Sequence, residues 1–594
     1  MRFITSIGLH LALICQVLLP STWGYSFDRT NLTDSGSKGA VSSEAGFCSR
    51  AGTHMLEKGG NAADAMVATV LCVGVSAPQT YRTELNTALG LYNSGIAGGG
   101  FALIRMPNNT YQMVDFREKA PLAATEDMFK DDPMGSKVGG RASGVPGQLR
   151  GLEYIYKTYG SKNVSWSDLF QPAIEVANVG WNVTNDILVM MDWALNGTMN
   201  STDPKHNFFL QPAWKPDFAP NGTLVKEGDI IMRKRYAKTL QRMARPDGVN
   251  DFYNGSIADS IIRAINANQG IMTKDDLKNY TIAIRKTNQM KYRNYTLTST
   301  TTPSCGSVVL NVLGVLNKYA NYSIKPGQDN VNIHRMVESI KFAYGYRMSF
   351  GDPDYTRNIT LLEKTILSDS RLTRIKHGIN DTYVHTNVSF YDPDHKWTKA
   401  PHGTSHMVAA DNSGLAISLT TTVNLPFGSH VMTDNGIVLN DQMDDFSIPG
   451  TENSMGYPAS PNNFIKPGKR PLSSISPVIA TRPDGSIAFV TGSAGGSRIP
   501  TAVIQSLVHA LDEDEAPQKC LDIPRLHHQL FPNVLEYAAN FDKPTISWLN
   551  QTHGHVIGPI PRIASAAQAI SRSVQGLFRT GSEPSQVLSG GYGV

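Results

Sequence analysis

The chain has 594 residues, of which 41% are hydrophobic and 18% are charged, and its formal net charge at pH 7 is +4. This hydrophobic content is ample for a large buried core, in one body or in several domains. The net charge is small for the length and no block of lysine and arginine stands out, so we expect no nucleic-acid partner.

Residues 1–24 read as a targeting segment. A basic start at Arg2 precedes a short apolar run, and small residues lead to Gly24, an order typical of a secretory signal peptide. The run is shorter than the ~20 residues that a spanning helix needs, and a retained signal anchor facing a lumen or the exterior is the alternative. Acceptor sequences for N-glycosylation recur, as suits a secreted glycoprotein, including Asn31, Asn163, Asn182, Asn196, Asn221, Asn254, Asn294, Asn358, Asn387 and Asn550.

Two helices and a hairpin are predicted near the amino terminus. Residues 46–59 and 61–75 are helical in pattern and are separated by a pair of glycines. The second of these is apolar around most of its surface, which predicts a buried helix. Residues 101–105 and 111–116 read as two strands around a Pro-Asn-Asn turn and predict a hairpin.

Helices dominate the middle of the chain. From residue 147 to about 318 the pattern is mainly helical, and residues 308–316 and 331–347 read as amphipathic helices. The segment 379–403 is polar, irregular and without strong periodicity. It would form a flexible tail if the chain were cut after Gly403, and it is a plain surface loop otherwise.

Strands dominate the last third of the chain. Residues 406–410 and 415–422 flank the sequence Asp-Asn-Ser-Gly, a strong turn signal, and neither alternates cleanly between polar and apolar residues. That pattern suits a sheet covered on both faces. A hairpin centred on this turn places Thr404 opposite Thr421, give or take one residue, so Thr404 and Thr422 should lie close together.

The Gly403–Thr404 bond is the most informative position in the sequence. A threonine hydroxyl is a poor nucleophile unless a base lies beside it, and a free α-amine is one such base. Cutting this bond would give Thr404 a new amine next to its own hydroxyl, with an unperturbed pKa of about 7.7–8.0. Without a cut, these two residues are the ordinary start of a strand.

Two groups of polar residues have the chemistry to bind a zwitterion. Arg117, in the sequence DFREKAP, offers a planar charged fork suited to a carboxylate, and its alternative role is a surface ion pair. Asp445 and Gln442, in DQMDDF, and Asn424, in TTVN, offer one charged acceptor and two amide acceptors to an ammonium group. The alternative for this second group is a polar turn.

Two more motifs complete the set. Ser473 and Ser474, in GKRPLSS, can donate two hydroxyl protons to a carboxylate beside Arg117. The pocket would then hold cationic and hydroxyl groups at one end and acceptors at the other. Gly495 and Gly496, in GSAGGS, can turn backbone N–H groups towards an oxyanion because no Cβ blocks the approach. A phosphate cradle is the competing interpretation, but no Lys-Ser/Thr pair follows the glycines.

Taken in their order along the chain, these motifs resemble those of the γ-glutamyltransferase (γ-glutamyltranspeptidase) family of N-terminal-nucleophile hydrolases, over residues 44–594. The resemblance implies an α/β fold, a four-layer αββα sandwich. It implies self-cleavage into a large subunit, residues 25–403, and a small catalytic subunit, residues 404–594, which form one body. It further implies transfer of the γ-glutamyl group of glutathione and other γ-glutamyl compounds to water, amino acids or peptides, without a metal or cofactor.

The resemblance also implies a role for each candidate residue. The nucleophile would be Thr404, and Thr422 would hydrogen-bond its hydroxyl. The backbone N–H groups of Gly495 and Gly496 would face the oxyanion. The substrate carboxylate would be bound by Arg117, Ser473 and Ser474. The substrate ammonium would be bound by Asn424, Gln442 and Asp445.

Four cysteines follow the signal segment. An oxidising compartment favours pairing, although sequence alone leaves the connectivity open. The resemblance implies a disulfide between Cys48 and Cys72, on neighbouring helices. We expect Cys305 and Cys520 to be buried thiols.

One segment departs from the family pattern, and two other functions remain open. Residues 79–93 add roughly a dozen residues to a connection that is much shorter in the family, either as a true loop insertion or as retained intron sequence. A related amidase, such as a cephalosporin-type acylase, should lack the full set of ammonium and carboxylate partners. A catalytically inactive secreted binding protein is the other alternative, against which the intact Thr404 argues.

Overall fold

The computed structural model describes residues 35–75, 93–198, 207–392, 394–398, 403–560, 565–586 and 588–594. The predicted signal segment lies outside these ranges, as does the predicted insertion apart from its last residue, Asn93. The backbone carbonyl of Asn93 accepts a hydrogen bond from the N–H of Val423 at 2.9 Å. The carboxyl end of the predicted insertion therefore lies beside the strand that carries Thr422.

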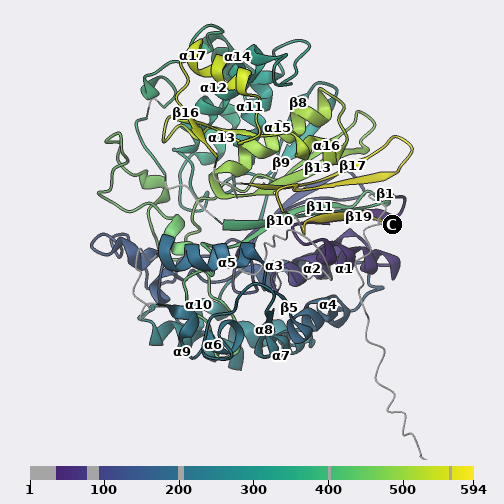
Figure 1. Ribbon diagram of the computed structural model, residues 1–594, viewed down its shortest axis with the longest axis vertical. Coiled ribbons are helices and arrows are strands. Elements are labelled where there is room, and N and C mark those ends of the chain that lie inside the picture. Colours follow the sequence, from purple (N-terminus) through teal and green to yellow (C-terminus); the bar gives the residue numbers. More distant parts are fainter. Residues whose placement is uncertain are drawn as a thin grey trace, which may run out of the picture.

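Within the described ranges, two seven-stranded antiparallel sheets lie face to face, and helices cover the outer face of each (Figure 1). This arrangement confirms the four-layer αββα sandwich. One sheet has the order β19 (Gly590–Gly593), β2 (Gly39–Ser43), β10 (Gly403–Asp411), β11 (Ala416–Asn424), β3 (Gly99–Arg105), β4 (Tyr111–Asp115), β7 (Ala283–Arg285). The other has the order β1 (Ser35–Gly36), β18 (Phe578–Ser582), β17 (Ala566–Arg572), β13 (Ile487–Ala494), β12 (Val478–Thr481), β9 (Tyr295–Ser299), β8 (Asn288–Tyr292).

The two predicted helices at the amino terminus are confirmed and pack against the first sheet. The side chain of Asn61 accepts hydrogen bonds from the first N–H groups of the second helix and so fixes its start. Every residue of that helix is buried, as its apolar surface predicts. The helices on this side are α1 (Gly46–Glu57), α2 (Ala62–Val73), α3 (Gln148–Tyr159), α4 (Trp166–Val179), α5 (Asn185–Asp192), α6 (Lys215–Phe218), α7 (Lys234–Met243), α8 (Gly248–Asn254), α9 (Ser256–Ala267) and α10 (Lys274–Lys278).

A second group of helices covers the other sheet. Its longest member begins at Asn330 and ends at Arg347, close to the predicted bounds. The group consists of α11 (Gly306–Leu316), α12 (Asn330–Arg347), α13 (Ile359–Ile366), α14 (Asp369–Gly378), α15 (Ile499–Leu511), α16 (Pro517–Asp522) and α17 (Lys543–Gln551).

Side chains alternate across β10, so its residues divide between two cores. Val408 and Ala410 belong to the core between the two sheets, whereas Met407 belongs to the core under the first group of helices. Thr404 is in phase with Val408. Its side chain therefore points into the space between the sheets, towards the second sheet.

The predicted hairpin that follows the Gly403–Thr404 bond is confirmed, with one irregularity. β10 and β11 are antiparallel, and Ser405 lies opposite Thr421 while Gly403 lies opposite Asn424. The register shifts between Gly403 and Ser405. Two steps along β10 face three along β11, so the extra residue lies on β11, opposite the bond singled out by the sequence. An extra residue of this kind re-aims the neighbouring side chains.

The prediction of mainly helical structure up to residue 318 is incomplete. Three strands, β7, β8 and β9, lie between residues 283 and 299. Two of them, β7 and β8, form the outer edges of the two sheets. Edge strands keep many polar residues, and this weakens the alternation by which strands are recognised.

Both sheets combine strands from before and after the Gly403–Thr404 bond. In the first sheet, β2 lies between β19 and β10. In the second, β9 pairs with β12 along four residues. The two predicted subunits therefore share both sheets.

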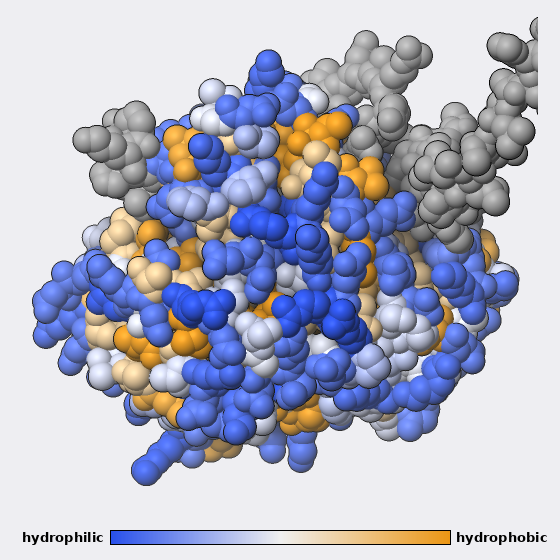
Figure 2. All heavy atoms as spheres, turned by 90° about the horizontal axis from the view of Figure 1, so that it is seen from below, coloured by the Kyte–Doolittle hydropathy of each residue, from blue (hydrophilic) through white to orange (hydrophobic). Residues whose placement is uncertain are grey.

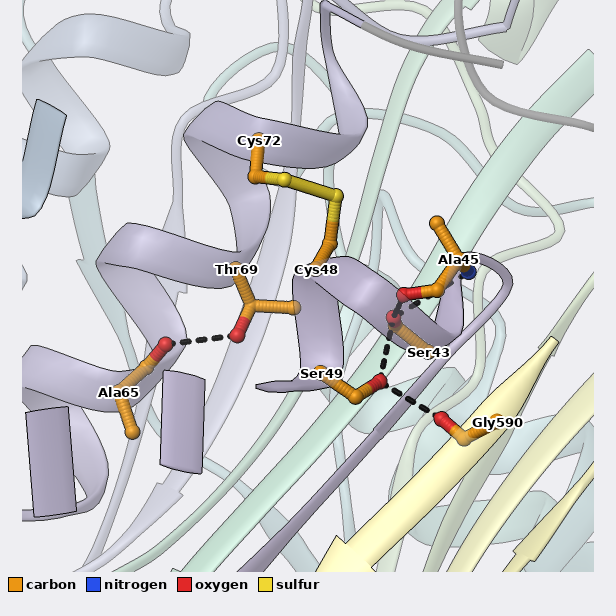
Figure 3. The surroundings of a disulfide bond; sticks show 8 residues. All are labelled: Ser43, Ala45, Cys48, Ser49, Ala65, Thr69, Cys72 and Gly590. Carbon is orange, nitrogen blue, oxygen red and sulfur yellow. Dashed lines mark hydrogen bonds between the residues drawn. A yellow bond between two sulfur atoms is a disulfide. The ribbon is translucent and has the colours of Figure 1, made fainter. Parts of the chain in front are cut away.

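The predicted disulfide is confirmed. Cys48 on α1 and Cys72 on α2 are bonded, with a Cα–Cα distance of 5.5 Å (Figure 3). Next to it, the Ser49 hydroxyl donates to the backbone carbonyl of Gly590 at 2.6 Å, which ties α1 to β19. Cys305 and Cys520 are buried and free, as expected.

The surface over the first group of helices is mixed. Figure 2 shows this face as mainly hydrophilic, with separate apolar patches among the charged and polar side chains. Exposed apolar residues scattered in this way are ordinary on a folded protein. In the part of the chain that the structure describes, no helix combines the length and the apolar character needed to cross a membrane.

Candidate active site

The Gly403–Thr404 bond lies at the start of β10 and is held on its carbonyl side. The Thr422 hydroxyl donates to the carbonyl oxygen of Gly403 at 2.7 Å. The backbone N–H of Asn424 donates to the same hydroxyl oxygen at 2.7 Å, which directs its proton towards Gly403. The expectation that Thr422 bonds the Thr404 hydroxyl differs from this geometry, because the bulge brings the Gly403 carbonyl to Thr422 instead.

The glycine motif meets the Thr404 side chain from the other sheet. Where β13 ends, the backbone N–H of Gly495 donates to the Thr404 hydroxyl at 2.9 Å. Gly495 has φ +115° and Gly496 has φ +60°, a region of backbone conformation that favours glycine. Thr404 is 6% exposed, and its hydroxyl is held by a backbone N–H group.

The two charged candidates contact each other. Nη2 of Arg117 pairs with Oδ2 of Asp445, and both side chains are buried. The amide nitrogen of Gln442 donates to the same carboxylate oxygen at 2.6 Å. Burial raises the pKa of Asp445, and the Arg117 charge opposes the rise. The predicted cationic and acceptor groups therefore contact each other directly in this structure.

Asn424 links the Arg117–Asp445 pair to the Gly403–Thr404 bond. Its backbone N–H holds Thr422, while its side-chain nitrogen donates to the backbone carbonyl and to the carboxylate of Asp441, both at 3.2 Å. Asp441 directly precedes Gln442 in the chain. The predicted ammonium partners and the predicted catalytic residues thus belong to one connected network.

The serine pair lies beside Arg117 in a buried loop. Nη2 of Arg117 donates to the backbone carbonyl of Leu472 at 3.4 Å, immediately before Ser473. The Ser473 hydroxyl accepts from the N–H of Ile475 at 3.2 Å. In the part of the chain that is described, neither serine hydroxyl donates its proton to a protein acceptor, so both protons are available to a ligand.

Glu118 is a neighbour that the sequence analysis missed. It is fully buried, and Nη1 of Arg117 lies 3.9 Å away. Among the described residues, neither carboxylate oxygen has a hydrogen-bond partner. Burial raises the pKa of Glu118 to about 8, against the opposing charge of Arg117. A Cβ added at Gly99 would come within 2.5 Å of the carboxylate, which explains a glycine there. The position of Glu118 next to Arg117 in DFREKAP was the sequence signal that could have marked it as a neighbour of the site.

A sequence model of the family described as gamma-glutamyltranspeptidase matches residues 48–590. The chain belongs to the γ-glutamyltranspeptidase family. It is 44% identical to the glutathione hydrolase proenzyme of Arthroderma benhamiae over 100% of this chain and 99% of the relative. It is 41% identical to the glutathione hydrolase of Aspergillus flavus over 93% of this chain and 89% of the relative.

The fold agrees with membership of the γ-glutamyltranspeptidase family. The structure is similar to that of cephalosporin acylase from Bacillus halodurans, with a TM-score of 0.78 over 97% of this chain and 99% of the other, at 22% identity. At that identity the likeness concerns the fold alone, which is that of the N-terminal-nucleophile hydrolases. Membership of this family makes the protein an enzyme of the hydrolase and acyltransferase class. Among the described residues, no group of His, Cys, Asp and Glu is arranged to hold a metal ion.

Proposed function

We propose that the protein is a secreted γ-glutamyltransferase and glutathione hydrolase that matures by cutting itself between Gly403 and Thr404. The observation that carries the proposal is the pair of hydrogen bonds at this bond, from Thr422 to the Gly403 carbonyl and from Gly495 to the Thr404 hydroxyl. Similarity to a relative named glutathione hydrolase proenzyme supports both the precursor and the substrate. Removal of residues 1–24 and cleavage would leave subunits 25–403 and 404–594.

The geometry of the uncut bond supports self-cleavage in the following steps. The Thr404 hydroxyl oxygen attacks the Gly403 carbonyl carbon, and the hydrogen bond from Thr422 stabilises the charge that develops on the carbonyl oxygen. The C–N bond then breaks, and the nitrogen takes up the hydroxyl proton and becomes the new α-amine of Thr404. Water hydrolyses the resulting ester, which yields the Gly403 carboxylate and restores the Thr404 hydroxyl.

The same hydroxyl then performs acyl transfer. The α-amine of Thr404 accepts its proton as the oxygen attacks the γ-carbonyl of the donor, and passes that proton to the leaving amine. The N–H groups of Gly495 and Gly496 face the oxyanion, and a γ-glutamyl ester forms on Thr404. Water or the amine of an acceptor amino acid or peptide attacks this ester and regenerates the hydroxyl.

The polar pocket matches the α-carbon of a glutamyl group, which carries an ammonium and a carboxylate side by side. Contact between Arg117 and Asp445 is therefore the arrangement such a ligand needs. Within the described part of the chain, the buried Gln442 side-chain oxygen has no hydrogen-bond partner and can accept from the ammonium. The Asn424 oxygen can do the same, since its nitrogen is held by Asp441. With Arg117 and the two serine hydroxyls on the carboxylate, this set favours a γ-glutamyl donor over amides that lack an ammonium and a carboxylate on one carbon.

The test uses Thr404→Ala and Thr404→Ser, secreted from the same host as the natural chain. We expect two fragments from the natural chain and from Thr404→Ser on a denaturing gel, and one uncut, inactive band from Thr404→Ala. If Thr404→Ala still splits at the same bond, an external protease makes the cut and the proposal fails. A natural chain that stays single and does not hydrolyse L-γ-glutamyl-p-nitroanilide would instead indicate an inactive binding protein, and faster hydrolysis of a cephalosporin side-chain amide would indicate an acylase.

A further inference from the structure

Arg347, the last residue of α12, is a buried cation beside the loop that carries Ser473 and Ser474. Its side chain is 2% exposed. Its guanidinium donates to the Ser474 hydroxyl at 3.0 Å, to the Thr398 hydroxyl at 2.7 Å and to the Cys305 sulfur at 3.3 Å. Among the described residues, it has no ion-pair partner. Buried charges are normally paired, so this guanidinium and the hydroxyls that it holds suit an anionic ligand.

The contact with Ser474 determines what that hydroxyl can do. Because the Ser474 oxygen accepts from a guanidinium, its own proton must point elsewhere, and the nearby positive charge makes it a stronger donor. Ser473 is held from the same side, since the Cys305 thiol donates to its backbone carbonyl at 2.9 Å while the Cys305 sulfur accepts from Arg347. Arg347 therefore orients the Ser473–Ser474 pair as a unit.

We propose that Arg347 is a positioning residue for the carboxylate end of the donor pocket. It holds the Ser474 hydroxyl with its proton towards the α-carboxylate. Its positive charge adds to that of Arg117 in favouring a carboxylate there. This inference rests on the proposed function, because it assumes a donor that carries an α-carboxylate. Arg347 does not touch the donor, and its effect is transmitted through Ser474.

The experiment measures kcat/KM for L-γ-glutamyl-p-nitroanilide and for the same anilide with its α-carboxylate converted to an amide. The ratio of the two values reports recognition of the carboxylate. Arg347→Gln should lower this ratio about tenfold or more, the loss typical of one hydrogen bond to a charged group. Ser474→Ala should lower it to a similar extent, and the double variant should lower it by no more than about twofold further, because both changes remove the same contact.

The control is Arg335→Gln, which removes an arginine from the same helix. Arg335 pairs with Asp381 at the surface and reaches neither serine, so its ratio should stay within about twofold of the natural protein. Both substrates are measured on one sample, so a loss of folded protein cancels in the ratio. If Arg347→Gln yields no mature protein, Arg347→Lys allows the same comparison, because a single ammonium cannot reproduce the three contacts of the guanidinium.

An unchanged ratio in the Arg347 variants would overturn the inference. If kcat/KM falls equally on both substrates, the ratio stays unchanged and the role of Arg347 is purely structural. Failure of the proposed function has a different signature, because the natural protein itself would then hydrolyse neither anilide or would not prefer the free acid.

Discussion

Arg117 and Asp445 form an ion pair in which the arginine is 1% exposed and the aspartate 4% exposed. Each has one charge to offer to a ligand, and in this structure each neutralises the other. A zwitterionic ligand would add one ammonium and one carboxylate, so the total charge of the site stays zero when the pocket fills. This arrangement avoids the large cost of leaving a single buried charge without a partner.

The pair can be tested by separating stability from recognition. Asp445→Ala leaves Arg117 buried without its partner, so we expect a loss of about 3–5 kcal/mol in the free energy of unfolding. We also expect kcat/KM on L-γ-glutamyl-p-nitroanilide to fall roughly ten- to a hundredfold, with self-cleavage retained. The double change Arg117→Met with Asp445→Leu should recover most of the stability and none of the activity. Unchanged kinetics in Asp445→Ala and in Arg117→Ala would refute the assignment.

Thr422→Val should slow maturation. The valine keeps the shape of threonine but removes the hydrogen bond to the Gly403 carbonyl, and loss of one donor to a developing oxyanion typically reduces the rate about a hundredfold or more. A time course on denaturing gels after a synthesis pulse measures the effect. Thr422→Ser keeps the hydroxyl and serves as the control. Equal cleavage rates in valine and serine variants would show that this hydrogen bond plays no part in the cut.

Stability should depend on pH through Glu118. Its pKa rises from 4.5 to about 8 because of burial, so between these values the folded protein holds a proton that the unfolded chain has lost. This contribution to stability is therefore full below pH 4.5 and declines as the pH rises to 8. Glu118→Gln removes it, and the melting temperature of the variant relative to the natural protein should increase from pH 5 to pH 8. Exposed Glu227 provides the control, and a constant difference across this range would contradict the assigned pKa.

Removing the disulfide should destabilise the protein. The bond joins residues 24 apart in the sequence, and closing a loop of about this length is expected to contribute about 3 kcal/mol. The double change Cys48→Ser with Cys72→Ser should therefore lower the melting temperature. A reductant should lower the melting temperature of the natural protein in the same way and leave the double variant unchanged. A reductant effect that persists in the variant would assign it to another thiol.

The sequence predicts well the features that local chemistry decides. The turn at residues 411–414 places Thr404 near Thr422 because a tight turn sets the register of the strands on either side. The buried helix α2 follows from its apolar surface, and the disulfide from the family resemblance. These predictions need no knowledge of distant contacts.

The missed features depend on residues that are far apart in the chain. The bulge that brings the Gly403 carbonyl to Thr422 leaves no pattern in the sequence. The pairing of Arg117 with Asp445 joins positions 328 residues apart. Arg347 lies on a helix that reads as amphipathic, and only the folded chain shows that it reaches Ser474.

Strands from both sides of the Gly403–Thr404 bond alternate in the sheets. The proposed cut at this bond would therefore make assembly irreversible. Before the cut, folding is an event within one molecule, and β2 finds its place between β19 and β10 through the chain that connects them. After the cut, an unfolded protein would have to rebuild both sheets from two separate chains at the concentration of each. We therefore expect the uncut chain to refold from denaturant more readily than the two subunits that the proposed cut would produce.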